Sequence, residues 1–201
     1  MNEQVNQAQK EIRLIKEMID RTKRNSVCNW LYLILWGLMA ILAIIGMHLL
    51  VILEKYSLIW LNWVIFMGIG ALWSAFLGIR QQRREKTRTY IGDALSGVGI
   101  ISGLAFFATG FAFPLMDLYP AGTIPVMIAI IAGVSSFSMG AILEWGYLKW
   151  CGILWLAGAL GMGFVHWHYR TLLFIPLLIA GYIVPGFIMQ KKYRNGRAKD
   201  E

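Results

Sequence analysis

The sequence predicts an all-α fold: a polytopic membrane bundle of six transmembrane helices in three hairpins, preceded by a cytoplasmic amphipathic helix. The first observation is composition, because 58% of the 201 residues are hydrophobic. The second is their arrangement in apolar runs of about 18 residues or more, each long enough to cross a bilayer as a helix, which satisfies its own backbone hydrogen bonds in lipid. The runs cover residues 30–53, 57–79, 91–116, 121–143, 150–167 and 171–189.

The chain divides into three regions. Residues 1–26 are expected to form a cytoplasmic heptad helix, residues 27–190 the transmembrane domain, and residues 191–201 a basic cytoplasmic tail. This length is too short for a membrane bundle together with a second folded domain.

The N-terminal region has apolar residues at alternating spacings of three and four, the pattern of a helix with one apolar seam. Ile12, Ile15 and Ile19 lie at the centre of this seam. Such a helix can pair with a second copy, pack beneath the bundle, lie on lipid headgroups or bind another protein. The sequence leaves these alternatives open.

The basic residues predict the orientation of the bundle. Of the 19 Lys and Arg residues, all except Lys55 and Arg170 lie before the first run, between runs two and three, between runs four and five, or after the last run. The positive-inside rule places these segments and both termini in the cytoplasm. Because topology explains the charge, we expect the lipid bilayer as a partner and no nucleic acid.

The three connections on the opposite side are short, at residues 54–56, 117–120 and 168–170. Short connections favour antiparallel neighbouring helices. Pro176 is expected in a first helical turn, where proline is tolerated, whereas Pro185 lies well inside its run and should kink the helix.

Small residues recur four apart in several runs, which favours close contact between helices. They are Gly70, Ser74 and Gly78 in the second run, Gly99 and Gly103 in the third, and Ala157 and Gly161 in the fifth.

Polar residues inside the runs are mostly uncharged. Ser135 and Ser138 share a helical face in the fourth run, Ser136 lies toward Gly140, and Asn62 lies in the second run. These side chains either pack against neighbouring helices or line a pathway, together with Ser96, Ser102 and Thr109.

Two acidic residues lie at the cytoplasmic ends of runs, and ionisable residues in a membrane are often functional. Asp93 follows the basic loop, where it can pair with Arg88, and Glu144 ends the fourth run beside aromatic residues. The two carboxylates either form interfacial ion pairs or build a proton or cation site.

His48, His166 and His168 lie toward the outer end of the bundle, at the level of Glu54 and Asp117. They offer ligands for a transition metal if the first and fifth runs lie close together. They can equally be interfacial histidines in an aromatic belt. We expect no metal and no other cofactor.

No catalytic set can be assembled from the sequence. Gly133-Val134-Ser135-Ser136 resembles the Gly-x-Ser of rhomboid proteases, but the last run has no histidine to activate the serine. Ile91-Gly92-Asp93 resembles part of the aspartyl intramembrane protease motif, but a second buried aspartate is missing. We therefore expect a protein that is not an enzyme.

A charged helix from Ile15 to Lys23 is followed by Leu35-Trp36-Gly37 in the first run. In these features the chain resembles small, uncharacterised six-span proteins of bacteria, mainly over its first 40 residues. The resemblance implies a bacterial inner membrane and brings no activity with it.

Two classes of function fit the sequence. The first is a non-enzymatic inner-membrane sensor, scaffold or accessory subunit with the N-terminal helix as its cytoplasmic contact. The second is a small transporter or channel for an apolar or uncharged solute. A packed bundle favours the first class, and a cavity reaching the membrane midplane favours the second.

Overall fold

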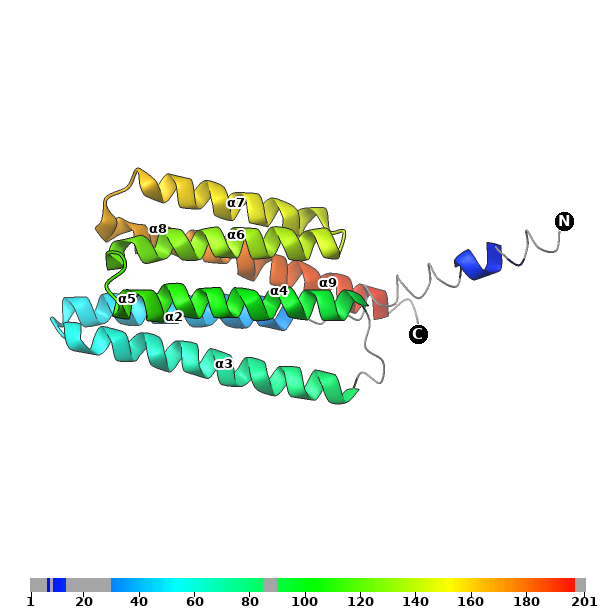
Figure 1. Cartoon of the computed structure of the whole chain (residues 1–201), viewed down its shortest axis with the longest axis horizontal. Helices are drawn as coiled ribbons and strands as arrows, with labels where there is room; N and C mark the ends of the chain where they lie inside the picture. The colour runs from blue at the N-terminus through cyan, green and yellow to red at the C-terminus, as the bar shows by residue number, and fades with distance from the viewer. Residues whose placement is uncertain (1–6, 8, 14–29, 85–89, 198–201) are drawn as a thin grey trace.

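Helices make up every regular element in the part of the chain that the structure describes. The structure, a computed structural model, describes residues 7, 9–13, 30–84 and 90–197, and the N-terminal residues among them are helical. The long helices alternate in direction along the chain (Figure 1). The elements from residue 30 onward are α2 (Trp30–Ile52), η2 (Tyr56–Leu58), α3 (Ile59–Arg84), α4 (Tyr90–Phe107), η3 (Ala108–Ala112), α5 (Phe113–Leu115), η4 (Ala121–Thr123), α6 (Ile124–Ile142), α7 (Gly146–Gly163), α8 (Trp167–Leu178), η5 (Ile179–Ile183) and α9 (Val184–Arg197).

Five helical segments are long and apolar enough to cross a membrane. The all-α prediction is confirmed over the described residues, and the five segments that could span a membrane match five of the predicted runs to within a few residues. The run at 150–167 corresponds to α7, which is not among the five. Lys149 and Tyr147 lie near the start of α7, and both lower its hydropathy. The five segments are Leu31–Ile52, Tyr56–Arg80, Tyr90–Leu115, Ala121–Ile142 and Tyr169–Lys191.

The connection before the last span differs from the prediction. Residues 168–170 belong to α8, and the chain turns at residues 164–166, where His166 is the N-cap with an extended ψ of 140°. The predicted position is wrong because α7 already ends at Gly163, a residue of low helix propensity. Pro176 consequently lies inside α8 and not in its first turn.

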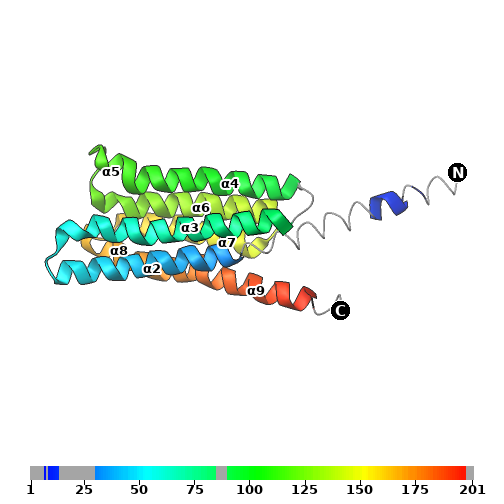
Figure 2. The same ribbon diagram turned by 90° about the horizontal axis from the view of Figure 1, so that it is seen from below.

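The core lies where α2, α6, α7 and α8 meet. Trp155 of α7 is fully buried, and its ring centroid lies 5.2 Å from those of Phe174 and Tyr182. α3 packs against α2, and α4 packs against α6, so both helices are peripheral (Figures 1 and 2). Large apolar side chains on them face outward, as Leu72 does at 75% exposure. This is the expected surface of a bundle surrounded by lipid.

The most extensive helix contact joins α6 and α7, which belong to two different predicted hairpins. A Cβ on Gly152 would lie 2.7 Å from the backbone nitrogen of Phe137 and 2.8 Å from the carbonyl oxygen of Gly133. The two backbones therefore touch at these glycines, as in other closely packed membrane helices.

The glycines predicted to pack behave differently from one another. Gly70 packs against Trp36, where its Cβ position lies 3.3 Å from the indole ring, and this prediction is confirmed. Gly99, Gly103 and Gly161 have no neighbouring atom within 4 Å of their Cβ positions among the described residues. The expectation that these three pack closely is wrong within a single copy of the chain, because their side of the helix faces outward.

Candidate functional site

The polar stripe of α6 is buried where this helix meets α4. The Ser135 Oγ lies 2.6 Å from the Ser102 Oγ. Each hydroxyl also lies 2.6 Å from a carbonyl oxygen four residues earlier, that of Ile131 for Ser135 and that of Val98 for Ser102. The two hydroxyl groups have two protons between them for these three contacts, two with carbonyl oxygens and one with each other. Both protons are used inside the helix pair and none remains for a solute.

The other residues of the predicted stripe are not gathered around a common space. Ser136 is buried, Ser138 is half-buried, and Ser96 is exposed on the outer face of α4. Asn62 belongs to a different helix pair, because its Nδ2 donates to the Ala43 carbonyl oxygen of α2 at 2.9 Å. Asn62 therefore joins α3 to α2, while Ser135 joins α6 to α4.

The two acidic candidates are both exposed at the surface. Asp93 lies in the first turn of α4, where a carboxylate is favoured by the helix dipole. Glu144 lies in the tight turn between α6 and α7 with a φ of 52°. Arg88, the predicted partner of Asp93, lies outside the described residues. The exposure of both carboxylates fits interfacial groups better than a buried cation site.

Two of the three histidines predicted as metal ligands, His48 and His166, have side chains that the structure describes. His48 Nδ1 lies 2.9 Å from the Ile44 carbonyl oxygen of its own helix, so it acts as the donor. His166 is exposed at the start of α8, and the side chain of His168 lies outside what the structure describes. Over residues 7, 9–13, 30–84 and 90–197, no group of three or more His, Cys, Asp or Glu residues could hold a metal ion.

Of the three isoleucines predicted to form the seam of the N-terminal helix, the structure describes only Ile12. Ile12 is helical and 65% exposed, whereas Ile15 and Ile19 lie outside the described residues. An exposed apolar side chain at this position is available for a partner.

Two spans contain a π-helical segment that ends two residues before a proline. They are η3, which precedes Pro114, and η5, which precedes Pro185. The N–H directly after each segment bonds five residues back, from Phe113 to Ala108 and from Val184 to Ile179. The next N–H of this pattern would belong to the proline, which has none.

The carbonyl groups of Thr109 and Ala180 therefore lack a backbone donor in this pattern, and a side chain from outside the π-segment approaches each. The Tyr119 hydroxyl donates to the Thr109 carbonyl oxygen at 2.5 Å. Burial raises the pKa of the Tyr119 hydroxyl above its usual value. The Cys151 thiol points to the Ala180 carbonyl oxygen at 3.9 Å. A thiol is a weak donor, so Ala180 is the less well satisfied carbonyl.

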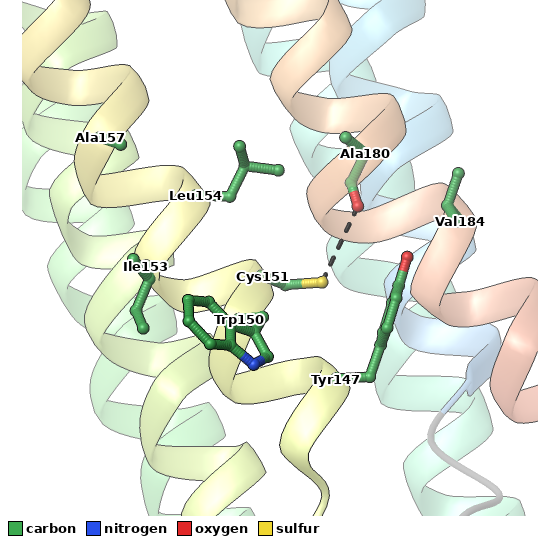
Figure 3. A pocket seen from close by; sticks show the side chains of 8 residues that line it. All are labelled: Tyr147, Trp150, Cys151, Ile153, Leu154, Ala157, Ala180 and Val184. Carbon is green, nitrogen blue, oxygen red and sulfur yellow. Dashed lines mark hydrogen bonds between the residues drawn. The ribbon is translucent and has the colours of Figure 1, made fainter.

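Ala180 and Cys151 form part of the wall of a groove between α7 and the η5–α9 segment (Figure 3). The groove has a volume of about 460 Å³ and is open to the surface of the bundle. Its wall is apolar apart from a few groups, chiefly the Tyr147 hydroxyl and the thiol. The groove is lined by Tyr147, Trp150, Cys151, Ile153, Leu154, Ala157, Ala180 and Val184.

Sequence reasoning did not identify this groove. Hydropathy treats Cys151, Leu154, Ala157 and Val184 as ordinary parts of the apolar runs 150–167 and 171–189. The available signal is a sequence pattern that both π-segments share. In it, a glycine is followed directly by an aromatic residue, and a proline comes three residues after the aromatic residue. It occurs from Gly110 to Pro114 and from Gly181 to Pro185. A Cβ on Gly181 would overlap the Trp155 indole, which explains the glycine.

Comparisons of the chain with protein-family models, with curated proteins and with solved structures found no match. The functional argument therefore rests on the residues and their arrangement.

Proposed function

We propose that the chain is a non-enzymatic integral membrane protein that acts as a sensor, scaffold or accessory subunit in a bacterial inner membrane. The observation that carries this proposal is the use of its polar side chains in helix contacts. Ser135 bonds within the α4–α6 pair and Asn62 within the α2–α3 pair. The centre of the bundle is filled by large apolar side chains around Trp155. A solute pathway would need such hydroxyl and amide groups to face water.

The proposal includes six spans with both termini in the cytoplasm. Three features support it. α2 begins and α9 ends at the same end of the bundle, and α7 runs beside α6 over its length (Figure 1). Arg80 and Lys149 also lie near helix ends on that side, and Lys191 lies in α9, which ends on that side. Basic residues at one end are typical of the cytoplasmic side.

The proposed contact with other proteins, or with a second copy, is the N-terminal helix. The exposed Ile12 supports an apolar seam that is free to bind. A helix with a single apolar stripe is a common docking element.

Cysteine accessibility tests the proposal. In a chain with Cys28 and Cys151 replaced by alanine, Ser135→Cys or Ser138→Cys should stay unreactive toward a membrane-impermeant thiol reagent applied from either side. Thiol modification requires the thiolate and hence water. Ser57→Cys, at an exposed position in η2, is the matched control and should react.

The opposite outcome supports the alternative function. Labelling of both Ser135→Cys and Ser138→Cys, blocked by a small uncharged solute, would reject the packed bundle. It would favour a transporter or channel for an apolar or uncharged solute.

A further inference from the structure

The groove between α7 and η5–α9 has the length of a lipid acyl chain in one leaflet. Its wall follows α7 from Tyr147 to Ala157 (Figure 3), a distance of about 15 Å at a rise of about 1.5 Å per residue. The hydrocarbon core of a bilayer is about 30 Å thick, so one leaflet contributes about 15 Å. An acyl chain that enters at one end of the groove would therefore reach the membrane midplane at the other.

The chemistry of the wall changes along this length. The end near the start of α7 carries Tyr147 and Trp150, residues typical of the headgroup level. The other end is formed by Leu154 and Ala157, which offer only apolar contact. This order matches a lipid, with its polar group at the aromatic end.

A positive charge lies at the headgroup end of the groove. Lys191 follows Val184 by seven residues in α9, so the two residues share one face of the helix. Val184 lines the groove and Lys191 is exposed. A phosphate held at the aromatic end would lie within the attraction of this ammonium group, which favours an anionic lipid.

The Cys151 thiol keeps the wall compatible with an acyl chain. The Ala180 carbonyl lacks its helical donor because of Pro185, and an acyl chain cannot supply one. The thiol covers this oxygen from the opposite wall, as Figure 3 shows. The groove therefore presents sulfur and carbon atoms where it would otherwise present an unpaired carbonyl.

We propose that this groove binds one anionic diacyl phospholipid, with an acyl chain between α7 and α9 and the phosphate at Lys191. The inference goes beyond the proposed function because it gives the protein a specific lipid ligand. It rests on the proposed function only in one respect, the assignment of the groove to the cytoplasmic leaflet, which follows from the positive-inside rule.

Photo-cross-linking of the full-length protein tests the site. The protein is reconstituted in phosphatidylcholine vesicles with a minor share of phosphatidylglycerol that carries a diazirine on one acyl chain. After illumination, peptides of α7 and α9 should carry most of the cross-linked lipid. Ala157→Phe should fill the groove and lower this labelling several-fold, whereas Ala75→Phe, at an exposed position of α3, should leave it unchanged. Even labelling of all exposed helices, or full labelling of Ala157→Phe, would overturn the proposal.

A second variant leaves the groove open and tests the headgroup. Lys191→Gln should lower labelling by the phosphatidylglycerol probe about fivefold, the effect of one basic residue near an anionic surface. Labelling should then equal that by a phosphatidylcholine probe. Arg80→Gln, at an exposed position near the end of α3, is the control for general attraction. Unchanged labelling of Lys191→Gln, or a phosphatidylcholine probe that labels wild-type protein equally, would overturn the proposal.

The two proposals fail separately. Vesicle labelling does not depend on which end of the bundle is cytoplasmic, so a wrong topology would leave the cross-link map intact. Conversely, water access at Ser135 would overturn the proposed function without changing the groove between α7 and α9.

Discussion

Three acidic residues hold backbone conformations that normally belong to glycine. Glu54, Asp117 and Glu144 have φ values of 57°, 54° and 52°. Each follows the end of a helix, and the next residue bonds back across the turn, as Lys55 N–H does to the Leu50 carbonyl oxygen at 2.9 Å. This is the hydrogen-bond pattern of a Schellman cap, in which the left-handed position favours glycine because a Cβ is strained there.

Replacing Glu54 by glycine should therefore stabilise the protein. We expect Glu54→Gly to raise the free energy of unfolding by about 1 kcal/mol, the cost of a side chain in the left-handed region. Thermal unfolding in detergent micelles, followed by circular dichroism, would measure the gain. Glu54→Ala is the matched control, because it removes the charge and keeps the strained Cβ. Equal gains in both variants would identify the carboxylate at the helix C-terminus, not the backbone, as the unfavourable group.

At the scale of elements, the contact between α6 and α7 depends on glycines that no side chain can replace. Gly152→Ala would place a methyl group against the backbone of Phe137. We expect this variant to lose on the order of 1–3 kcal/mol of stability through overpacking. Gly161→Ala, in the same helix but with open space at its Cβ, should be neutral or gain up to about 1 kcal/mol from helix propensity. Comparable losses in both variants would show that the close approach does not determine stability.

The hydrogen bond from Tyr119 to Thr109 can be tested by a double-mutant cycle. Tyr119→Phe should cost about 1 kcal/mol, because the Thr109 carbonyl loses its side-chain donor. In a Pro114→Ala background, the restored N–H can serve that carbonyl, so the same substitution should cost less. The difference between the two costs is the coupling energy. An identical cost in both backgrounds would show that the Tyr119 hydrogen bond does not compensate for the N–H that Pro114 lacks.

The sequence predicted which segments are helical better than how those helices pair. Long apolar runs identify segments such as 30–53 because length and hydropathy are local properties. The close approach of α6 and α7 occurs at Gly133 and Gly152, whereas Gly99 and Gly103, also glycines within an apolar run, have open space around them. The Ser102–Ser135 contact could not be predicted either. The sequence shows two hydroxyls on two runs, and only the packing of α4 on α6 brings them together.

For the whole molecule, the number of spans is the property to establish, and α7 decides it. A topology reporter inserted after Glu144 should lie in the cytoplasm, and one inserted after Val165 should lie outside, if α7 crosses the membrane. A reporter after Glu201 should again be cytoplasmic, as the distribution of Lys and Arg predicts. Reporters after Glu144 and Val165 on the same side would show that α7 does not span and that the bundle has five spans.

The π-segment in the last span changes which way the helix faces. An added residue in a helical turn offsets the side chains before and after it by about 100° around the axis. Before η5, Phe174 and Leu178 point into the core. After it, Pro185 and Met189 are still buried on the core side, while Val184 borders the groove and Lys191 follows on the same face as Val184. A segment of uniform hydropathy thus serves two different neighbours, with the change of phase at the midpoint of the membrane span.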